Sequence, residues 1–154
     1  GYAVDYISNY LALEGYDNHM VEIGGEVRCM GLNRGKKWSV AIVNPITSSF
    51  IDTLYITNKS VATSGNYRNF YEIKGNTYTH IINPITGYPL EKSPVSTTVI
   101  STNCMVADGY ATALMATGVK GINVIDKNKL TECMILIDNN GTIEHHYSKS
   151  FKQQ

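Results

Sequence analysis

The chain has 154 residues, of which 43% are hydrophobic and 17% are charged, and its thirteen basic residues balance thirteen acidic ones. A chain this apolar is not disordered, and without net charge it has no overall field that would attract nucleic acid or an anionic membrane. The length suits one domain with its own core, so we expect a single domain over residues 1–154 that does not bind nucleic acid.

The start of the chain predicts a helix and then a strand region. Residues 2–14 carry apolar side chains at helical spacing, and Gly15 follows as a stop signal. Residues 20–29 have strand-like sequence that is interrupted by Gly24-Gly25. A double glycine at such a place indicates a β-bulge or a close approach of the backbone to another group.

The middle of the chain continues with β patterns. Residues 37–45 have the pattern of a buried strand that ends at Asn-Pro, and residues 49–58 and 60–73 follow with β-branched and aromatic side chains. Residues 74–77 (Lys-Gly-Asn-Thr) are typical of a hairpin turn, which leads into an apolar strand over residues 78–84.

The last third predicts helices between strands. Residues 95–103 are β-branched and predict a strand, residues 104–118 switch to helical spacing, and residues 119–129 favour a second short helix. Residues 132–148 predict a closing hairpin with Asn-Asn-Gly as its turn. A helix, about seven strands, two helices and two strands indicate an α+β fold, with a mixed or antiparallel sheet packed against helices.

The three cysteines, Cys29, Cys104 and Cys133, are far apart and form no Cys-x-x-Cys pair. This spacing argues against a structural zinc site and against a disulfide framework. Each cysteine lies in or beside an apolar stretch, so we expect buried free thiols. No stretch reaches the roughly 18 consecutive apolar residues of a membrane-spanning helix.

Asp108 and Thr112 are four residues apart in the helix predicted over 104–118. Four residues place both side chains on one face, about one turn apart. A carboxylate and a hydroxyl supply the oxygen ligands that Mg²⁺ prefers, and phosphate groups of a substrate commonly complete its coordination. The alternative is that Asp108 only caps or charges the first helical turn and that Thr112 has no particular role.

Two further segments contain residues suited to a phosphate group. Thr63-Ser64-Gly65-Asn66 combines small hydroxyls with a glycine, which can turn backbone N–H groups toward an anion or simply form a turn. His80 stands at the end of an apolar run, and its charge changes near neutral pH, which suits a general acid or a phosphate contact. A histidine hydrogen-bonded to the backbone is the alternative.

Six short motifs in one order resemble the FAD:protein FMN transferases of the ApbE family, over nearly the whole chain. The family pattern has Gly-Tyr-Ala-Val-Asp after a lysine, a Gly-Gly strand, Thr-Ser-Gly-Asn/Asp-Tyr, His-Ile-Ile-Asp-Pro-x-Thr-Gly and Ala-Asp-x-x-x-Thr. The corresponding segments here are GYAVD (1–5), VEIGGEVRCMG (21–31), WSVAIVNP (38–45), VATSGNYRNF (61–70), THIINPITGYP (79–89) and ADGYATALMATG (107–118).

The resemblance implies the ApbE-like, T-fold-like architecture and a Mg²⁺-dependent phosphoryl transfer. FMN would move from FAD to a threonine or serine of an acceptor flavoprotein, with release of AMP. It assigns the metal to Asp108 and Thr112 and a contact with FAD to Ile82. It implies that His80 lies beside the pyrophosphate and has a candidate catalytic role. It also implies further cofactor contacts by Ser64 and Gly65.

The resemblance also implies that this chain is the C-terminal portion of a longer envelope protein, a periplasmic or outer-face bacterial lipoprotein that is able to form a homodimer. For this portion alone we expect weak FAD binding and little activity. Asn83 stands where the family usually has Asp, and Ala111 where some members have a further acidic metal ligand. A Mg²⁺-dependent FAD pyrophosphatase and a non-catalytic flavin-binding module are the alternative functions.

Overall fold

The computed structural model describes residues 1–44, 47, 49–66, 70–73, 76–90, 93–139 and 141–151. Its helical elements are α1 (Tyr2–Leu13), α2 (Cys104–Thr117), the 3₁₀ helix η1 (Gly118–Gly121) and α3 (Ile122–Ile125). Its strands are β1 (His19–Ile23), β2 (Glu26–Met30), β3 (Trp38–Val43), β4 (Phe50–Ile56), β5 (Lys59–Gly65), β6 (Phe70–Ile73), β7 (Asn76–Thr79), β8 (Ser96–Ser101), β9 (Glu132–Asn139) and β10 (Thr142–Tyr147). The predicted helices and the predicted order of elements are therefore confirmed, with eight described strands ahead of α2 instead of about seven.

A six-stranded sheet in the order β1-β2-β5-β8-β9-β10 is the framework of the fold, and every neighbouring pair in it is antiparallel. The α+β class predicted from the order of elements is confirmed, with an antiparallel main sheet. Strand β8 lies in the middle of the sheet, and all six of its residues are buried. Central strands are buried on both faces when both faces of the sheet are covered.

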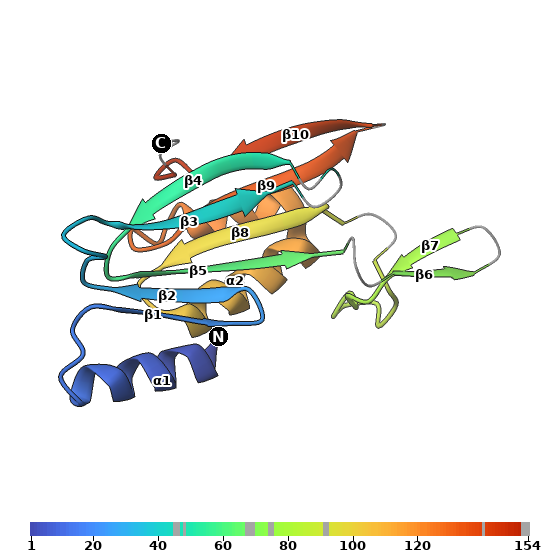
Figure 1. Cartoon of the computed structure of the whole chain (residues 1–154). Helices are drawn as coiled ribbons and strands as arrows, with labels where there is room; N and C mark the ends of the chain where they lie inside the picture. The colour runs from blue at the N-terminus through green and yellow to red at the C-terminus, as the bar shows by residue number, and fades with distance from the viewer. Residues whose placement is uncertain are drawn as a thin grey trace.

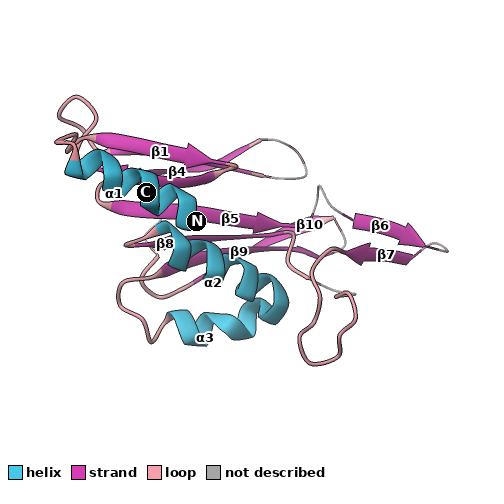
Figure 2. Cartoon of the chain, turned by 90° about the horizontal axis from the view of Figure 1, so that it is seen from below, coloured by secondary structure: helices cyan, strands magenta, loops and turns pink. Residues whose placement is uncertain are grey.

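Two separate layers cover this sheet. The hairpin β3–β4 lies across one face, and α2 with α3 lies across the other, as Figures 1 and 2 show. On the hairpin side, Ile42, Leu54 and Ile56 pack against apolar side chains of the sheet. On the helical side, Ala107 and Ala111 are completely buried against the sheet, because small side chains let the helix approach the strands closely. The second strand pair, β6–β7, forms its own two-stranded sheet.

The sequence suggested a bulge or a close backbone approach at Gly24-Gly25, but the structure shows neither. The two glycines form the two-residue turn of the β1–β2 hairpin, in which Ile23 pairs with Glu26. Both have positive φ, 68° and 102°, which is the backbone conformation that a type I′ turn needs and glycine adopts without strain. A Cβ built on Gly25 would meet nothing within 4 Å, so the conformation and not the space accounts for the glycine.

The prediction of a fully buried strand over residues 37–45 is wrong for the part that is described. Only Ile42 of β3 is buried, and its neighbours alternate between partly buried and exposed. The reason is that β3 belongs to a hairpin that covers the sheet with one face only. The turn predicted at 74–77 includes residues 74 and 75, and the Asn-Asn-Gly turn includes residue 140; these residues lie outside the described part. Arg68, a basic residue shortly after the Thr63-Ser64-Gly65-Asn66 segment, also lies outside it.

The cysteine prediction is confirmed: Cys29, Cys104 and Cys133 are all buried free thiols. Burial raises the pKa of the Cys29 and Cys133 thiols to about 11 and that of Cys104 to about 12. Among the residues that the structure describes, no helix combines the length and the apolar character needed to cross a membrane.

Candidate functional site

The first turn of α2 is capped by two side chains. Asn103 is the N-cap residue, and its side-chain oxygen accepts a hydrogen bond from the backbone N–H of Val106 at 2.9 Å. The carboxylate of Asp5 accepts two more, from the N–H groups of Cys104 at 2.9 Å and Met105 at 2.8 Å. A carboxylate at this position also interacts favourably with the partial positive charge of the helix N-terminus.

Asp5 reaches this turn from α1 and also binds Arg28 of β2. Arg28 Nη1 donates to Asp5 Oδ1 at 2.6 Å, and the two side chains are only 14% and 12% exposed. Asp5 thus joins α1, β2 and α2 through one buried carboxylate. The sequence analysis missed this role, because the partners of Asp5 lie on β2 and α2, far from it in sequence.

Asp108 neither caps α2 nor lies in its first turn, so that part of the alternative is wrong. It lies one turn further along α2 and is 41% exposed, and its Oδ2 accepts a hydrogen bond from the amino group of Gly1 at 2.8 Å. Glu26 of β2 also lies within its electrostatic reach. Burial, and then the negative charge of Asp108, raises the pKa of the Glu26 carboxyl above its usual value. Glu26 was not singled out from the sequence, because nothing local connects it to α2.

Thr112 is brought together with Ser64. The side-chain oxygens of these residues lie 3.2 Å apart, which joins the end of β5 to the middle of α2 across 48 residues of sequence. The neighbouring helix residue, Ala111, points its methyl group into the core, and its carbonyl accepts a hydrogen bond from the buried hydroxyl of Thr97 at 2.7 Å. The Thr-Ser-Gly segment and the Asp-Thr helix face, which were separate candidates in the sequence, are therefore in contact.

Residues 81–90 form a turn that closes on itself. Leu90 N–H donates to the Ile81 carbonyl at 3.0 Å, and Asn83 N–H donates to the Tyr88 carbonyl at 2.9 Å. The side-chain oxygen of Asn83 accepts from the N–H groups of Ile85 at 2.9 Å and Thr86 at 3.4 Å. This is an Asx-type turn, and the amide oxygen makes the bonds that an aspartate oxygen would make. Asn83 therefore supplies the side-chain acceptor that closes this turn without a negative charge.

The turn is anchored on α2 through apolar contacts. Ile81 and Leu90 are buried against Met115, one turn beyond Thr112. Ile82 alternates to the outside and is 50% exposed, and His80 at the start of the turn is exposed as well. The predicted cofactor residues His80 and Ile82 thus lie on an element that packs against the helix carrying Asp108 and Thr112.

These residues fit a magnesium ion that shares its coordination with a substrate. The donors are one half-exposed carboxylate, on Asp108, and the neighbouring hydroxyls of Thr112 and Ser64. Within the described part of the chain, no three His, Cys, Asp or Glu side chains gather to hold a metal by themselves. Oxygen-only donors with few carboxylates are typical of Mg²⁺ bound jointly by protein, water and phosphate.

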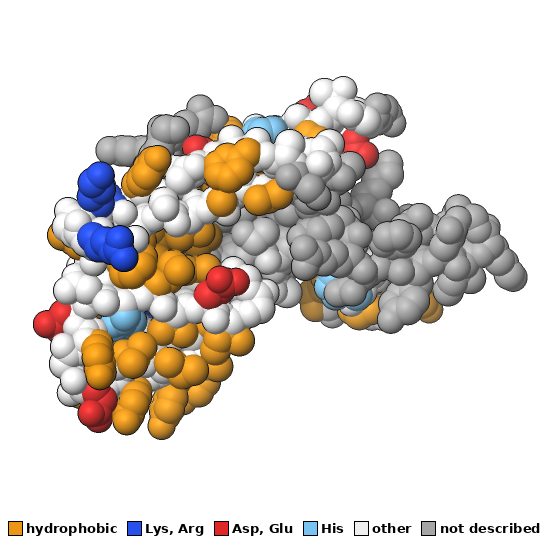
Figure 3. Space-filling view, in the orientation of Figure 1, with side chains coloured by type: hydrophobic (Ala, Val, Ile, Leu, Met, Phe, Trp, Pro, Cys, Tyr) orange, Lys and Arg blue, Asp and Glu red, His pale blue; other side chains and the backbone are white. Residues whose placement is uncertain are grey.

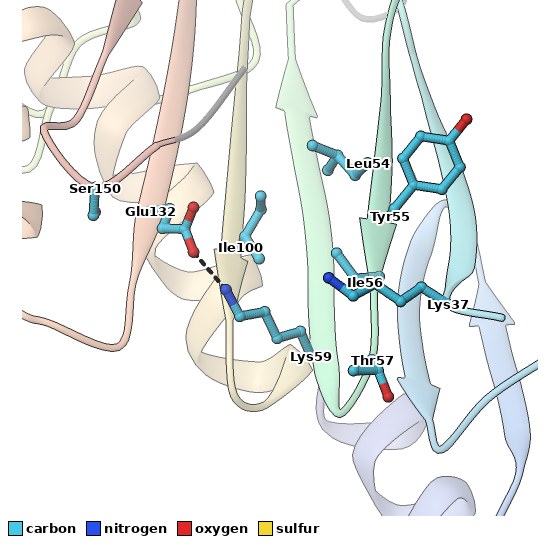
Figure 4. A pocket seen from close by; sticks show the side chains of 9 residues that line it. All are labelled: Lys37, Leu54, Tyr55, Ile56, Thr57, Lys59, Ile100, Glu132 and Ser150. Atoms are coloured by element: carbon cyan, nitrogen blue, oxygen red, sulfur yellow. Dashed lines mark hydrogen bonds and ion pairs between the residues drawn. The ribbon is translucent and has the colours of Figure 1, made fainter. Parts of the chain in front are cut away.

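A hollow of about 370 Å³ lies elsewhere in the molecule, apart from these residues. Lys59 and Glu132 form an ion pair at its mouth, and Leu54, Ile56 and Ile100 form its apolar wall (Figure 4). Lys59 begins β5, whereas Ser64 lies near the end of that strand, and the wall belongs to the core on the hairpin side of the sheet. Its lining includes none of the predicted site residues.

Comparison with known proteins gives a consistent result. Residues 1–135 match the model of the ApbE family. The chain is 42% identical over 156 residues to the FAD:protein FMN transferase of Vibrio cholerae, which covers 99% of this chain and 46% of that protein. It is 37% identical over 158 residues to the enzyme of the same name from Haemophilus influenzae, with 99% and 45% covered.

Solved structures show the same relationship. The fold superposes on the flavin transferase ApbE from Vibrio cholerae with a TM-score of 0.83 and 36% identity, covering 97% of this chain and 48% of that one. The apo form of the flavinyl transferase ApbE from Pseudomonas stutzeri gives a TM-score of 0.84 at 30% identity, with 97% and 47% covered. The chain thus spans less than half the length of these relatives.

Proposed function

This chain belongs to the ApbE family, and we propose that it carries the metal and phosphate side of a FAD:protein FMN transferase. One observation carries the proposal: the Ser64 and Thr112 hydroxyls lie 3.2 Å apart, one helical turn from the exposed carboxylate of Asp108. Oxygen donors from a strand end and a helix face therefore converge at an exposed place, and such donors suit a cation that is shared with phosphate.

The proposed reaction is a phosphoryl transfer in which one P–O bond replaces another. The hydroxyl oxygen of a threonine or serine on an acceptor flavoprotein attacks the FMN phosphorus of FAD, and the bond from that phosphorus to the bridging oxygen breaks. The products are the FMN phosphoester of the acceptor and AMP, and the hydroxyl proton is released. When bound, Mg²⁺ neutralises charge that develops on the phosphate oxygens.

The residues of this chain would divide the task between two elements. On the helical side, Asp108 and Thr112 hold the cation, with Ser64 and the adjacent Gly65 next to the phosphates. On the other side, the closed turn presents Ile82 to FAD, while the exposed imidazole of His80 takes up the proton of the acceptor hydroxyl. Histidine suits this role because its ordinary pKa lies near neutral pH.

A second function is favoured by the openness of the site. Asp108 is 41% exposed and Thr112 is exposed, so water has access to the place where the acceptor hydroxyl would react. If water takes the place of that hydroxyl, the same residues hydrolyse FAD to FMN and AMP. A module that only binds flavin is the third possibility, and it differs from both by having no turnover.

One experiment separates the three. The protein containing this chain is incubated with FAD, Mg²⁺ and a flavoprotein carrying an acceptor threonine, and products are followed by gel fluorescence and by chromatography of nucleotides. We expect a covalently fluorescent acceptor and AMP in equal amounts, and none of either after chelation of Mg²⁺. Free FMN with AMP would indicate hydrolysis, and bound FAD without products would indicate a binding module.

The matching variant test uses two aspartates. Asp108→Ala should lower the Mg²⁺-dependent rate at least about 100-fold, since it removes the only protein carboxylate assigned to the cation. Asp17→Ala, at an exposed position outside the site, should leave the rate unchanged. An Asp108→Ala protein with the normal rate would exclude the metal assignment.

We further propose a location in the bacterial envelope, on the basis of family resemblance. Fractionation of cells that express the natural gene tests this directly. We expect the protein in the membrane or periplasmic fraction; recovery in the cytosol alone would contradict the proposal.

A further inference from the structure

Helix α1 has two sides that are both suited to burial, and only one of them is covered in the described structure. On the inner side, Val4 and Ser8 are buried, and Val4 packs with Leu11 against Val21 and Cys104. On the outer side lies a row of large side chains that we call the aromatic stripe. It consists of Tyr2, Tyr6, Tyr10 and Leu13, which are 67%, 64%, 57% and 87% exposed.

The spacing of the stripe makes it one continuous surface. Positions 2, 6, 10 and 13 recur every three or four residues, so they lie along a single face of the helix. Figure 3 shows hydrophobic side chains gathered over the region of α1 at the lower end of the molecule. A helix on the outside of a protein normally carries polar side chains on the face away from the core, whereas a helix that is apolar on both sides lies between two layers.

The surroundings of the stripe are also open among the residues that the structure describes. Strand β1, against which α1 packs, is an edge strand of the six-stranded sheet, and its Ile23 is 42% exposed. An open edge with apolar side chains is a place where natural proteins add a covering element. Beside the first turn of the stripe is a hollow of about 490 Å³, lined by Tyr2, Asp5, Asn9 and Arg28 among others, which offers polar groups at the rim of the apolar face.

We propose that the aromatic stripe is the surface on which the remaining half of a complete transferase fold packs. The relatives are more than twice as long as the part that matches this chain. Because 97% of the chain superposes on them, their additional polypeptide lies outside the fold described here. Among the described helices, α1 alone combines a buried inner side with four large apolar side chains on its outer side.

The size of the stripe favours a covalently joined partner over a second copy of the chain. With about 200 Å² for a fully exposed aromatic side chain, the stripe offers roughly 600 Å². Separate molecules that associate stably bury about 800 Å² on each partner. Domains of one polypeptide are held together with less, because the tether raises their effective concentration. Tyrosine is also a suitable side chain here, since its hydroxyl remains hydrogen-bonded at the border of an interface.

The test is a fusion protein. The part of the Vibrio cholerae FAD:protein FMN transferase that has no counterpart here is joined ahead of Gly1 through a flexible linker, and side-chain exposure is measured by hydroxyl-radical footprinting. We expect modification of Tyr6 and Tyr10 to fall at least fivefold relative to the chain alone. Tyr55, on β4 at the opposite face of the sheet and 51% exposed, serves as the control and should react equally in both proteins.

A matched pair of leucines tests the same surface energetically. Leu13→Glu should lower the melting temperature of the fusion by about 5 °C or more, but leave the chain alone nearly unchanged, because Leu13 is 87% exposed there. Leu130→Glu, at a 65% exposed leucine in the segment between α3 and β9, should be neutral in both.

Three results would overturn the proposal. The first is equal footprinting of Tyr6 and Tyr10 in the fusion and in the chain alone. The second is an equal response of the fusion to Leu13→Glu and Leu130→Glu. The third is a dimer of the chain alone that Leu13→Glu dissociates, which would assign the stripe to a second copy. None of these measurements needs FAD, so failure of the proposed function leaves this proposal standing, and the reverse also holds.

Discussion

The two elements that form the candidate site are held in place by opposite means. The first turn of α2 has a local cap, Asn103, but it is also fixed by a group that is distant in sequence: Asp5 lies about 100 residues away and is itself bound to Arg28. The turn over residues 81–90 is fixed almost entirely by its own atoms, through Asn83 and the backbone pairs that surround it.

This difference separates what the whole fold determines from what a short sequence determines. The position of α2 depends on α1, β2 and the sheet together, so a substitution that shifts any of them also shifts Asp108. The shape of the turn depends on a few residues, and only its attachment to Met115 connects it with the rest of the molecule. Substitutions in the first element should therefore have global effects, and those in the second should have local effects.

The largest effect is expected from Asp5→Ala. It leaves Arg28 without its partner in a buried environment and removes the acceptor for two N–H groups of α2, so the free energy of unfolding should fall by about 3–5 kcal/mol. Urea denaturation measures this, with Asp17→Ala as a control that stays within about 0.5 kcal/mol of the natural chain. Thiol labelling at pH 8 gives a second measure: burial raises the pKa of the Cys104 thiol to about 12, so it should react only after the turn opens.

Asp5→Asn separates charge from hydrogen bonding at the same position, and it protects the test against a variant that does not fold. It keeps one side-chain oxygen for the N–H groups but loses the ion pair with Arg28. An intermediate loss of stability is expected. A loss as small as that of Asp17→Ala would show that the first turn of α2 does not depend on this carboxylate.

The next largest effect is expected from Met115→Ala, which tests the connection between the two elements. Met115 is 1% exposed and packs against Ile81 and Leu90, so its removal leaves a cavity and should cost about 2–3 kcal/mol. Amide exchange at Leu90 should accelerate at the same time. Met105→Ala, on the same helix but 52% exposed, is the matched control; equal effects of the two would mean that the turn is not held by α2.

A smaller and local effect is expected from Asn83→Ala. The substitution removes the acceptor for the N–H groups of Ile85 and Thr86, at a cost of about 1 kcal/mol at this exposed place. Exchange at those two amides should become faster, while labelling of Cys104 should not change. Asn83→Asp restores an acceptor oxygen and should restore protection; if it does not, the turn is not closed by this side chain.

The smallest effect on stability is expected from Thr112→Val. The side chain is exposed and loses only its contact with Ser64, so the free energy of unfolding should change by less than about 0.5 kcal/mol. The Mg²⁺ concentration needed for half-maximal FMN transfer should nevertheless rise severalfold. Thr117→Val, an exposed threonine at the end of the same helix, should change neither quantity, and Thr112→Ser should be close to the natural protein.

The same division explains how much could be predicted from the sequence. Elements with a local signal were predicted correctly, such as the helix before Gly15, which ends at Leu13, and the closing hairpin of β9 and β10. Gly24-Gly25 was a correct signal with the wrong interpretation, because a two-residue hairpin turn and a bulge both place glycine between strand residues.

The site was predictable only within each segment. The four-residue spacing of Asp108 and Thr112 gave their common helix face, but no spacing rule relates Ser64 to Thr112, which meet through the order of strands in the sheet. Asp5 and Glu26 were missed for the same reason. Their partners lie on other elements, and a side chain in an amphipathic pattern does not indicate which distant group it will meet.

The buried carboxylate of Asp5 has a mechanical consequence. It sits on the same helix as the aromatic stripe, and its oxygens hold the backbone of Cys104 and Met105. A displacement of α1 along or around its axis must therefore carry the start of α2 with it or break these bonds. Whatever covers the outer face of α1 would thus influence the position of Asp108, the residue that we propose as a metal ligand.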